Sequence, residues 1–183
     1  MAAQGGPVSG GHPQASTRIF GTDGDTIWSM TDPACFTVDE AQPKDAPAIA
    51  TIHLTSRRRA MPYLRRPHTD DETRDFFAQV VGDRRQAWWV VRHRGQVVGY
   101  MLIDGENLDH LYVSPSCQGR GFGSALLDWA KALSPGRLVL WTFQRNARAR
   151  SFYEARGFRS IGQTDGENEE GEPDVHYEWR TAP

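Results

Sequence analysis

The segment that decides the fold, residues 108–124, reads LDHLYVSPSCQGRGFGS. Its first part, Leu108 to Val113, has the apolar and aromatic composition of a strand, and Ser114-Pro115 ends it. Glycine then occupies every second position from Gly119 to Gly123, and helical periodicity begins directly afterwards. The segment therefore predicts a strand, a glycine-rich loop and a helix in direct succession.

The glycine-rich loop has the features of an anion-binding site. Glycines let the backbone approach a ligand closely, and the first N–H groups of the following helix have no partner within the helix. Together with the helix dipole and the positive charge of Arg120, these groups favour a phosphate. The G-x-G-x-G spacing differs from the dinucleotide fingerprint, and no Lys-Ser/Thr pair follows as in a P-loop. The alternative is that the glycines only form a tight turn.

The rest of the chain predicts strands and helices around this segment. Before it, a short β-type run at 36–38 precedes two helices, and the second helix starts with a capping box of Thr69 and Glu72. A hairpin of two strands, 87–92 and 96–103, follows. After the segment come a helix stopped by Pro135-Gly136, a buried strand at 138–143, a helix capped by Asn146 and ended at Gly157, and two strands around an acidic loop. This order predicts one α/β domain, with a mixed central sheet of about seven strands flanked by about four helices.

The composition is that of an ordinary soluble globular protein, with 183 residues, 38% hydrophobic residues, 24% charged residues and a formal net charge of -2. This charge indicates neither a nucleic-acid nor a membrane partner, and no apolar run approaches the ~18 residues of a membrane helix. Cys35 and Cys117 form no CxxC pair, and no other metal-ligand cluster stands out, so no metal is predicted. Because no signal peptide is recognisable, the chain is expected in the cytoplasm.

Residues 1–35 differ from the remainder of the chain. They are rich in small and polar residues and carry little periodic pattern, which predicts a mobile N-terminal extension. The ordered domain is therefore expected over residues 36–183.

Two motifs resemble the GNAT superfamily of N-acetyltransferases. QGRGFG at 118–123 resembles that family's Q/R-x-x-G-x-G/A pyrophosphate loop, and LYVSP at 111–115 resembles the strand and turn before it. NARARSFYEARGF at 146–158 resembles the family's second signature, N-x-x-A-x-x-F-Y-E-x-x-G-F. The motifs occur in the family's order and at about its separation, and the resemblance covers roughly residues 36–180. On these motifs the chain is identified as a member of the GNAT superfamily.

The resemblance implies where acetyl-CoA binds. The sheet is expected to split at the strand 108–113, with acetyl-CoA in the gap and pantetheine along the strand's backbone. The residues implied to bind acetyl-CoA are Leu111, Tyr112, Val113, Gln118, Gly119, Arg120, Gly121, Phe122, Gly123, Ser124 and Asn146. Core packing also accounts for the side chains of Leu111 and Val113, because the implied contact uses their backbone.

The implied reaction is a direct attack of an amine on the thioester, which needs a base, an oxyanion donor and an acid. Tyr153 matches the family's tyrosine that protonates the departing thiolate, and an aromatic core residue is the alternative. The backbone N–H of Val113 is the expected oxyanion donor. Asp109, four residues before Val113, is the expected base. A bulge in this strand would instead turn His110 or Glu106 inward, and a water relay also stays open.

The predicted acceptor side carries opposite charges. Five arginines at 57–66 form a basic patch and residues 165–174 form an acidic run, which suggest opposite substrates and are also explained as solvated surface. His68 is a candidate for the acceptor pocket, whereas the capping box accounts for Glu72. The tryptophans expected in the core are Trp88, Trp89, Trp129 and Trp141.

The leading hypothesis is an acetyl-CoA-dependent N-acetyltransferase acting on the primary amine of a small molecule. The second is acetylation of a protein N-terminus or lysine, which a long open groove in place of a closed pocket would favour. The third is a chain that binds acyl-CoA without catalysis, as a sensor. The sequence leaves open the acceptor, the base, the acyl chain length and the formation of a homodimer.

Overall fold

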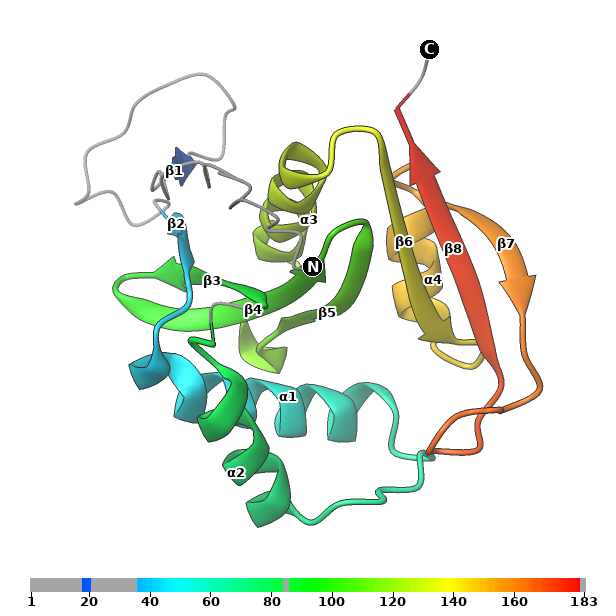
Figure 1. Cartoon of the computed structure of the whole chain (residues 1–183), viewed down its shortest axis with the longest axis horizontal. Helices are drawn as coiled ribbons and strands as arrows, with labels where there is room; N and C mark the ends of the chain where they lie inside the picture. The colour runs from blue at the N-terminus through cyan, green and yellow to red at the C-terminus, as the bar shows by residue number, and fades with distance from the viewer. Residues whose placement is uncertain (1–17, 21–35, 84–85, 182–183) are drawn as a thin grey trace, which may run out of the picture.

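A single mixed sheet forms the centre of the chain in the computed structural model, which describes residues 18–20, 36–83 and 86–181. Its strands lie in the spatial order β1-β2-β3-β4-β5-β6-β8-β7 (Figure 1). The strands are β1 Arg18–Phe20, β2 Phe36–Glu40, β3 Ala87–His93, β4 Gln96–Asp104, β5 Asn107–Val113, β6 Arg137–Phe143, β7 Arg159–Gln163 and β8 Asp174–Arg180. The helices are α1 Ala46–Ala60, α2 Asp70–Val80, α3 Phe122–Leu133 and α4 Ala147–Glu154, and single 3-10 turns cover Pro43–Asp45 and Pro115–Cys117.

The sheet opens between β5 and β6. These two strands are parallel neighbours, whereas the other neighbouring pairs among the described strands are antiparallel. They pair at Asn107 and Val139, and Val139 also donates its N–H to the carbonyl of Glu106 at 2.8 Å. Beyond this point β5 and β6 diverge (Figure 1). The predicted α/β fold with a split mixed sheet is therefore confirmed, and the three-residue β1 adds an eighth strand at one edge.

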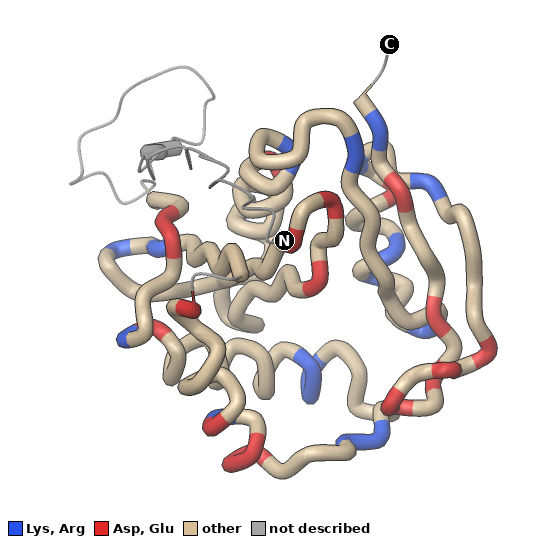
Figure 2. Tube along the Cα trace, in the orientation of Figure 1, with Lys and Arg blue, Asp and Glu red and all other residues tan. Residues whose placement is uncertain are grey.

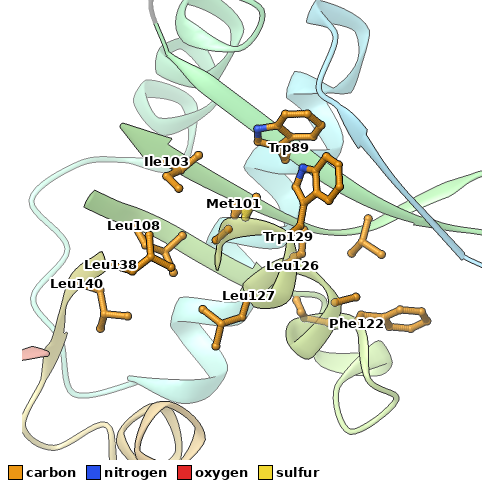
Figure 3. Close-up of a cluster of buried hydrophobic side chains, with 14 of the residues drawn as sticks. Trp89, Met101, Ile103, Leu108, Phe122, Leu126, Leu127, Trp129, Leu138 and Leu140 are labelled. Atoms are coloured by element: carbon orange, nitrogen blue, oxygen red, sulfur yellow. The ribbon is translucent and has the colours of Figure 1, made fainter. Parts of the chain in front are cut away.

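Helices cover the sheet on both faces. On one face, α1 and α2 place Ile49 and Phe77 in a buried cluster with Trp88 and Tyr100 of the sheet. On the other face, α3 and α4 bury their apolar stripes in a second cluster, which continues from β3 to β8. Figure 3 shows Leu126 and Leu127 of α3 in this cluster, beside residues of β4, β5 and β6. The α3/α4 cluster thus spans both sides of the opening between β5 and β6.

The tryptophans follow the prediction with one exception. Trp88, Trp89 and Trp129 are buried, as expected. Trp141 was expected in the core and this was wrong, because its side chain is 52% exposed. Side chains alternate along β6, so Leu140 faces α4 and Trp141 faces the opposite way, where it stacks on His176 with the ring centroids 4.2 Å apart.

Local signals in the sequence produce the expected turns and caps. Thr69 caps α2 by accepting from the Glu72 N–H, and the Glu72 carboxylate accepts from the Thr69 N–H at 2.7 Å. The hairpin between β3 and β4 turns at Arg94 and Gly95, whose φ angles of 52° and 75° are typical of a two-residue hairpin. Gly157 follows α4 with a φ of 85°, the left-handed conformation that glycine adopts without strain.

Gly99 of β4 allows the close approach of β5. A Cβ at this position would lie 2.9 Å from the carbonyl oxygen of Tyr112 and 3.0 Å from Cγ1 of Val91. Because a backbone oxygen cannot rotate away, we expect Gly99→Ala to lower the free energy of unfolding by about 1–3 kcal/mol. Urea denaturation measures this, with Gly136→Ala as the control, since a Cβ at Gly136 meets nothing within 4 Å. Equal losses in the two variants would contradict the prediction.

The expected mobile extension, residues 1–35, lies outside the described residues except for Arg18–Phe20. These three residues pair with β2 in antiparallel register, Arg18 opposite Val38.

Candidate functional site

A bulge in β5 decides which of its side chains face which way. Leu102 of β4 pairs with His110, whereas the next residue, Ile103, pairs with Leu108. Asp109 is therefore the extra residue on β5, and the alternation of side chains shifts by one position at this point.

The bulge turns His110 toward the α1/α2 face of the sheet. Its ring centroid lies 5.6 Å from that of His53 on α1. Tyr112, two residues further along β5, faces the same way and lies 5.0 Å from His53 between centroids. Leu111 and Val113 face the α3/α4 side instead. The end of β5 thus presents polar aromatic rings to one face and aliphatic side chains to the other.

Asp109, the expected base, does not reach either of the cavities described below. Asp109 is exposed to solvent on one side, and partial loss of hydration on the other, followed by the charge of Asp104, raises the pKa of its carboxyl. Glu106, another alternative, forms an ion pair with Arg137 at 2.5 Å. Of the alternatives named from the sequence, the geometry brings only His110 into a cavity.

A cavity of about 490 Å³, here named the split cavity, lies at the opening between β5 and β6. The predicted acetyl-CoA residues that line it are Leu111, Tyr112, Val113, Gln118, Gly119, Gly121, Gly123, Ser124 and Asn146. Residues of α4, among them Phe152 and Tyr153, line it from the other side. The structure therefore brings together the two sequence motifs, which are separated in the chain by α3 and β6.

The glycine loop has room for a ligand against its backbone. Gly119 and Gly121 have φ angles of 79° and 86°, and a Cβ built at either would meet no atom within 4 Å. Gly121 is the N-cap residue of α3, so the first N–H groups of this helix lie at the cavity. An elongated group that ends in phosphates fits this open, glycine-lined helix start.

Two residues of the loop point elsewhere. The Arg120 guanidinium contacts Nε2 of His93 at 3.1 Å and stands over the Phe122 ring. Phe122 is buried in the core below α3. Neither side chain lines the split cavity, so of these two residues only the backbone is placed near it.

Hydrogen bonds hold the end of β5 in place. The carbonyl of Val113 accepts from the Ser56 hydroxyl at 3.0 Å and from the Gln118 side-chain amide at 3.1 Å. Asn146 caps α4 by accepting from the Ala149 N–H at 3.2 Å, and this keeps its side chain at the cavity wall. These bonds fix the end of β5 to α1 and to the loop, and fix Asn146 to the start of α4.

Tyr153 combines burial with access to the split cavity. Its side chain packs in the core cluster, and its ring centroid lies 5.5 Å from that of Phe158. Burial, with a smaller contribution from Tyr112, raises the pKa of Tyr153 well above its usual range. The phenol therefore stays protonated near neutral pH and can donate a hydrogen bond or a proton.

A second cavity, of about 660 Å³ and here named the α1/α2 cavity, adjoins the split cavity at Met61, which lines both. Its walls come from α1, α2 and their connection, from His110, and from Glu169 and Glu170 of the β7–β8 loop. Arg57 holds this loop by an ion pair with Glu170 at 2.5 Å, and His68 lies 3.5 Å from Glu169. Figure 2 shows the acidic residues of the loop beside the end of α1 and the connection after it.

Two histidines of this cavity are held in the neutral form. Burial, and to a smaller extent the charges of His110 and Arg57, lower the pKa of His53 to about 3. Burial, followed by the charge of Arg57, lowers the pKa of His110 to about 4. Nδ1 of His53 lies 2.7 Å from the Tyr100 hydroxyl, whereas Nδ1 of His110 is buried with no hydrogen-bond partner.

These depressed pKa values predict a loss of stability in acid. In the unfolded chain His110 binds a proton near its ordinary pKa of 6.5, but in the folded chain only near 4. The contribution of neutral His110 to the free energy of unfolding is therefore complete above pH 6.5 and is lost as the pH falls. The loss is about 2 kcal/mol between pH 7 and pH 5. In urea denaturation, His110→Gln should lose about 2 kcal/mol less than the wild type over this interval. Equal losses in the two proteins would contradict the assignment.

Sequence reasoning missed several residues of the two cavities. His53 and Ser56 lie on α1 and Met61 directly follows this helix, and no motif marks any of the three. One signal in the sequence could have found His53. It follows Ile49 by four residues, and this spacing places both residues on the buried side of the helix. Arg156, at the end of the second motif, lines the split cavity and donates to the Ser124 hydroxyl at 2.7 Å.

Within the described residues, no group of three or more His, Cys, Asp or Glu side chains is arranged to hold a metal ion. In the same part of the chain, none of the helices has the length and apolar character needed to cross a membrane.

Comparisons with known proteins agree with this architecture. Residues 84–160 match the family model described as acetyltransferase (GNAT) domain. The chain is 35% identical over 78 residues to the peptidyl-lysine N-acetyltransferase YjaB of Salmonella typhimurium, covering 43% of this chain and 53% of that protein. It is 27% identical over 149 residues to a probable N-acetyltransferase of Mycobacterium tuberculosis, covering 72% of this chain and 84% of that protein. The match to YjaB thus spans about half of the length of that relative.

The solved structures show the same fold. The solution structure of apo-form YjaB from Escherichia coli superimposes with a TM-score of 0.68 at 22% identity, covering 80% of this chain and 99% of that chain. The fold is thus shared with solved proteins, and the relatives that match in sequence are named N-acetyltransferases. A GNAT acetyltransferase domain is therefore recognised over residues 84–160, and the relatives and the shared fold agree with it.

Proposed function

We propose that the chain is an acetyl-CoA-dependent N-acetyltransferase that transfers the acetyl group to the primary amine of a small molecule. One observation carries this proposal: the split cavity and the α1/α2 cavity meet at Met61, and the end of β5 forms a wall of both. A donor bound along Leu111 to Val113 would place its reactive end next to a second cavity large enough for an acceptor. Residues 36–183 would form the catalytic domain.

The residues at the junction supply the groups that the reaction needs. The acyl donor supplies a thioester carbonyl, and the amine nitrogen forms a bond to its carbon as the bond to sulfur breaks. The backbone N–H of Val113 would stabilise the oxygen that becomes negative. Tyr153, kept protonated by burial, would give its proton to the leaving sulfur. The nitrogen would lose its proton to His110 or to a water molecule, because Asp109 lies outside both cavities.

The shape of the α1/α2 cavity supports a small acceptor. The β7–β8 loop borders it on one side and is held there by the Arg57–Glu170 ion pair. Arg145 joins the same loop to the α1–α2 connection, since it stands 3.8 Å above the Tyr63 ring and 3.5 Å from Glu172. A pocket bounded in this way favours a small molecule over a folded protein surface.

Acetylation of a lysine side chain in a protein is the second candidate. Two curated relatives, YjaB of Salmonella typhimurium and YiaC of Escherichia coli, carry the name peptidyl-lysine N-acetyltransferase. An acceptor lysine would have to enter between the β7–β8 loop and α2.

The test follows the release of the CoA thiol from acetyl-CoA with a panel of polyamines, amino acids, aminoglycosides and peptides. The proposal predicts turnover with at least one small amine and no dependence on a folded protein acceptor. Turnover only with protein lysines would favour the second candidate. Failure to bind acetyl-CoA in a calorimetric titration would overturn the proposal itself.

A further inference from the structure

The charges around the α1/α2 cavity carry an inference about its acceptor. Three carboxylates line this cavity, and each is either paired or exposed to solvent. Glu170 pairs with Arg57 at 2.5 Å, and Glu169 lies 3.5 Å from His68. Glu72 accepts from the N–H of Thr69 at 2.7 Å as part of the capping box. Glu72 and Glu170 are thus already paired, whereas the Glu169 side chain is 75% exposed to solvent, so no buried carboxylate lining the described cavity is left to receive an ammonium group.

The wall nearest to the junction is aromatic and uncharged. His53, Phe77 and His110 form it, with Tyr100 behind them and Tyr112 beside them. Arg57 is the cation that acts on this wall, and its positive charge opposes protonation of both histidines. The other charged or titratable groups that line the cavity are Arg58 and Arg66, which both pair with Asp70, together with His68 and the carboxylates Glu72, Glu169 and Glu170.

An amine that enters this environment experiences the same two effects as the histidines. Burial disfavours its charged form because an ammonium loses its hydration, and the charge of Arg57 disfavours it further. No engaged carboxylate offsets these effects without giving up its present partner. The form of the acceptor that fits this wall is therefore the uncharged free base, which is also the form with a lone pair for attack.

We infer that the α1/α2 cavity takes its acceptor as the uncharged free base and so selects weakly basic amines, of the α-amino kind, over lysine-type alkylamines. The inference rests on the proposed function and names the acceptor class for it. An α-amino group has a pKa of about 7.7–8.0 and a lysine side chain one of about 10.4, so near pH 7 the free base is roughly 100-fold or more abundant for the first.

Two isomers of one compound test the inference. Nε-acetyl-lysine amide offers only an α-amine, and Nα-acetyl-lysine amide offers only an ε-amine. With acetyl-CoA at pH 7 we expect kcat/KM to be about 100-fold higher for the α-amine isomer. The rate for the ε-amine isomer should rise about tenfold for each unit of pH up to pH 9, whereas the rate for the α-amine isomer should level off near pH 8. Equal rates, or a preference for the ε-amine at pH 7, would overturn the inference.

Arg57→Gln tests the electrostatic cause. This substitution should reduce the ratio of kcat/KM for the α-amine isomer to kcat/KM for the ε-amine isomer by about fivefold or more. It should also raise the pKa of His53 and of His110 in an NMR titration. Arg59→Gln is the matched control, because Arg59 lies on the same helix but lines neither cavity. This control should leave both the ratio and the histidine titrations unchanged. An unchanged ratio in Arg57→Gln would overturn the role of Arg57.

Binding separates failure of this inference from failure of the proposed function. If neither isomer is acetylated, each is titrated into the protein saturated with CoA at pH 7. Tighter binding of the α-amine isomer would support the selection of a weakly basic amine even though the proposed transfer had failed. Equal binding, tighter binding of the ε-amine isomer, or no binding of either isomer would overturn the inference.

Discussion

Replacing Tyr153 with phenylalanine is expected to lower kcat for acetyl transfer by about 100-fold, the usual size of a general-acid contribution. The phenol lines the split cavity beside Leu111 to Val113, and burial keeps it protonated. Phenylalanine retains the ring contacts with Phe158 and removes only the proton donor. The KM for acetyl-CoA should therefore change far less than kcat. Steady-state kinetics with the best acceptor from the panel measure both constants.

Tyr177→Phe is the matched control for this variant. Tyr177 is also fully buried in the same cluster, but its hydroxyl donates to Glu154 at 2.5 Å and lies outside both cavities. This control should lose about 1 kcal/mol of stability and keep its kcat. If the two variants lose the same activity, the effect is structural and Tyr153 is not the acid. If Tyr153→Phe keeps full activity, the leaving thiolate needs no proton from this residue.

Leu126→Ala is expected to lower the free energy of unfolding by about 3 kcal/mol, because it removes a fully buried side chain and leaves a cavity. Leu126 lies on α3 in the cluster that joins this helix to the sheet (Figure 3). The helix begins at the glycine loop, so weaker packing of α3 also loosens the wall of the split cavity. Urea denaturation followed by circular dichroism measures the change.

The same substitution at Leu133 provides the control. Leu133 ends α3 and is 37% exposed, so Leu133→Ala should cost less than about 1 kcal/mol. A comparable loss at the two positions would show that helix propensity, and not burial in the cluster, determines the effect.

The sequence by itself determined the elements of this protein and their order. Apolar alternation, the capping box at Thr69 and the glycine at 157 are local signals, and each acts on a few neighbouring residues. For this reason the mixed sheet and its four helices were predictable. Likewise, the two motifs predicted most of the residues that line the split cavity, because the glycine spacing and the helix start belong to one continuous segment.

Tertiary contacts decide which side chains reach the α1/α2 cavity. The bulge at Asp109 depends on how β5 pairs with β4, and it exchanges Asp109 for His110 at the α1/α2 cavity. Trp141 is exposed because no described helix covers its face of β6, which its apolar neighbours in sequence do not reveal.

The α1/α2 cavity is the clearest case of a site that only the tertiary structure assembles. His53 and Arg57 of α1, His110 of β5 and Glu170 of the β7–β8 loop come from three separate parts of the chain. Periodicity reports which face of an element is buried, but strand register and contacts between distant segments depend on packing of the whole domain. Most residues that line the split cavity could therefore be predicted from local sequence, whereas the charge and the shape of the α1/α2 cavity depend on the folded chain.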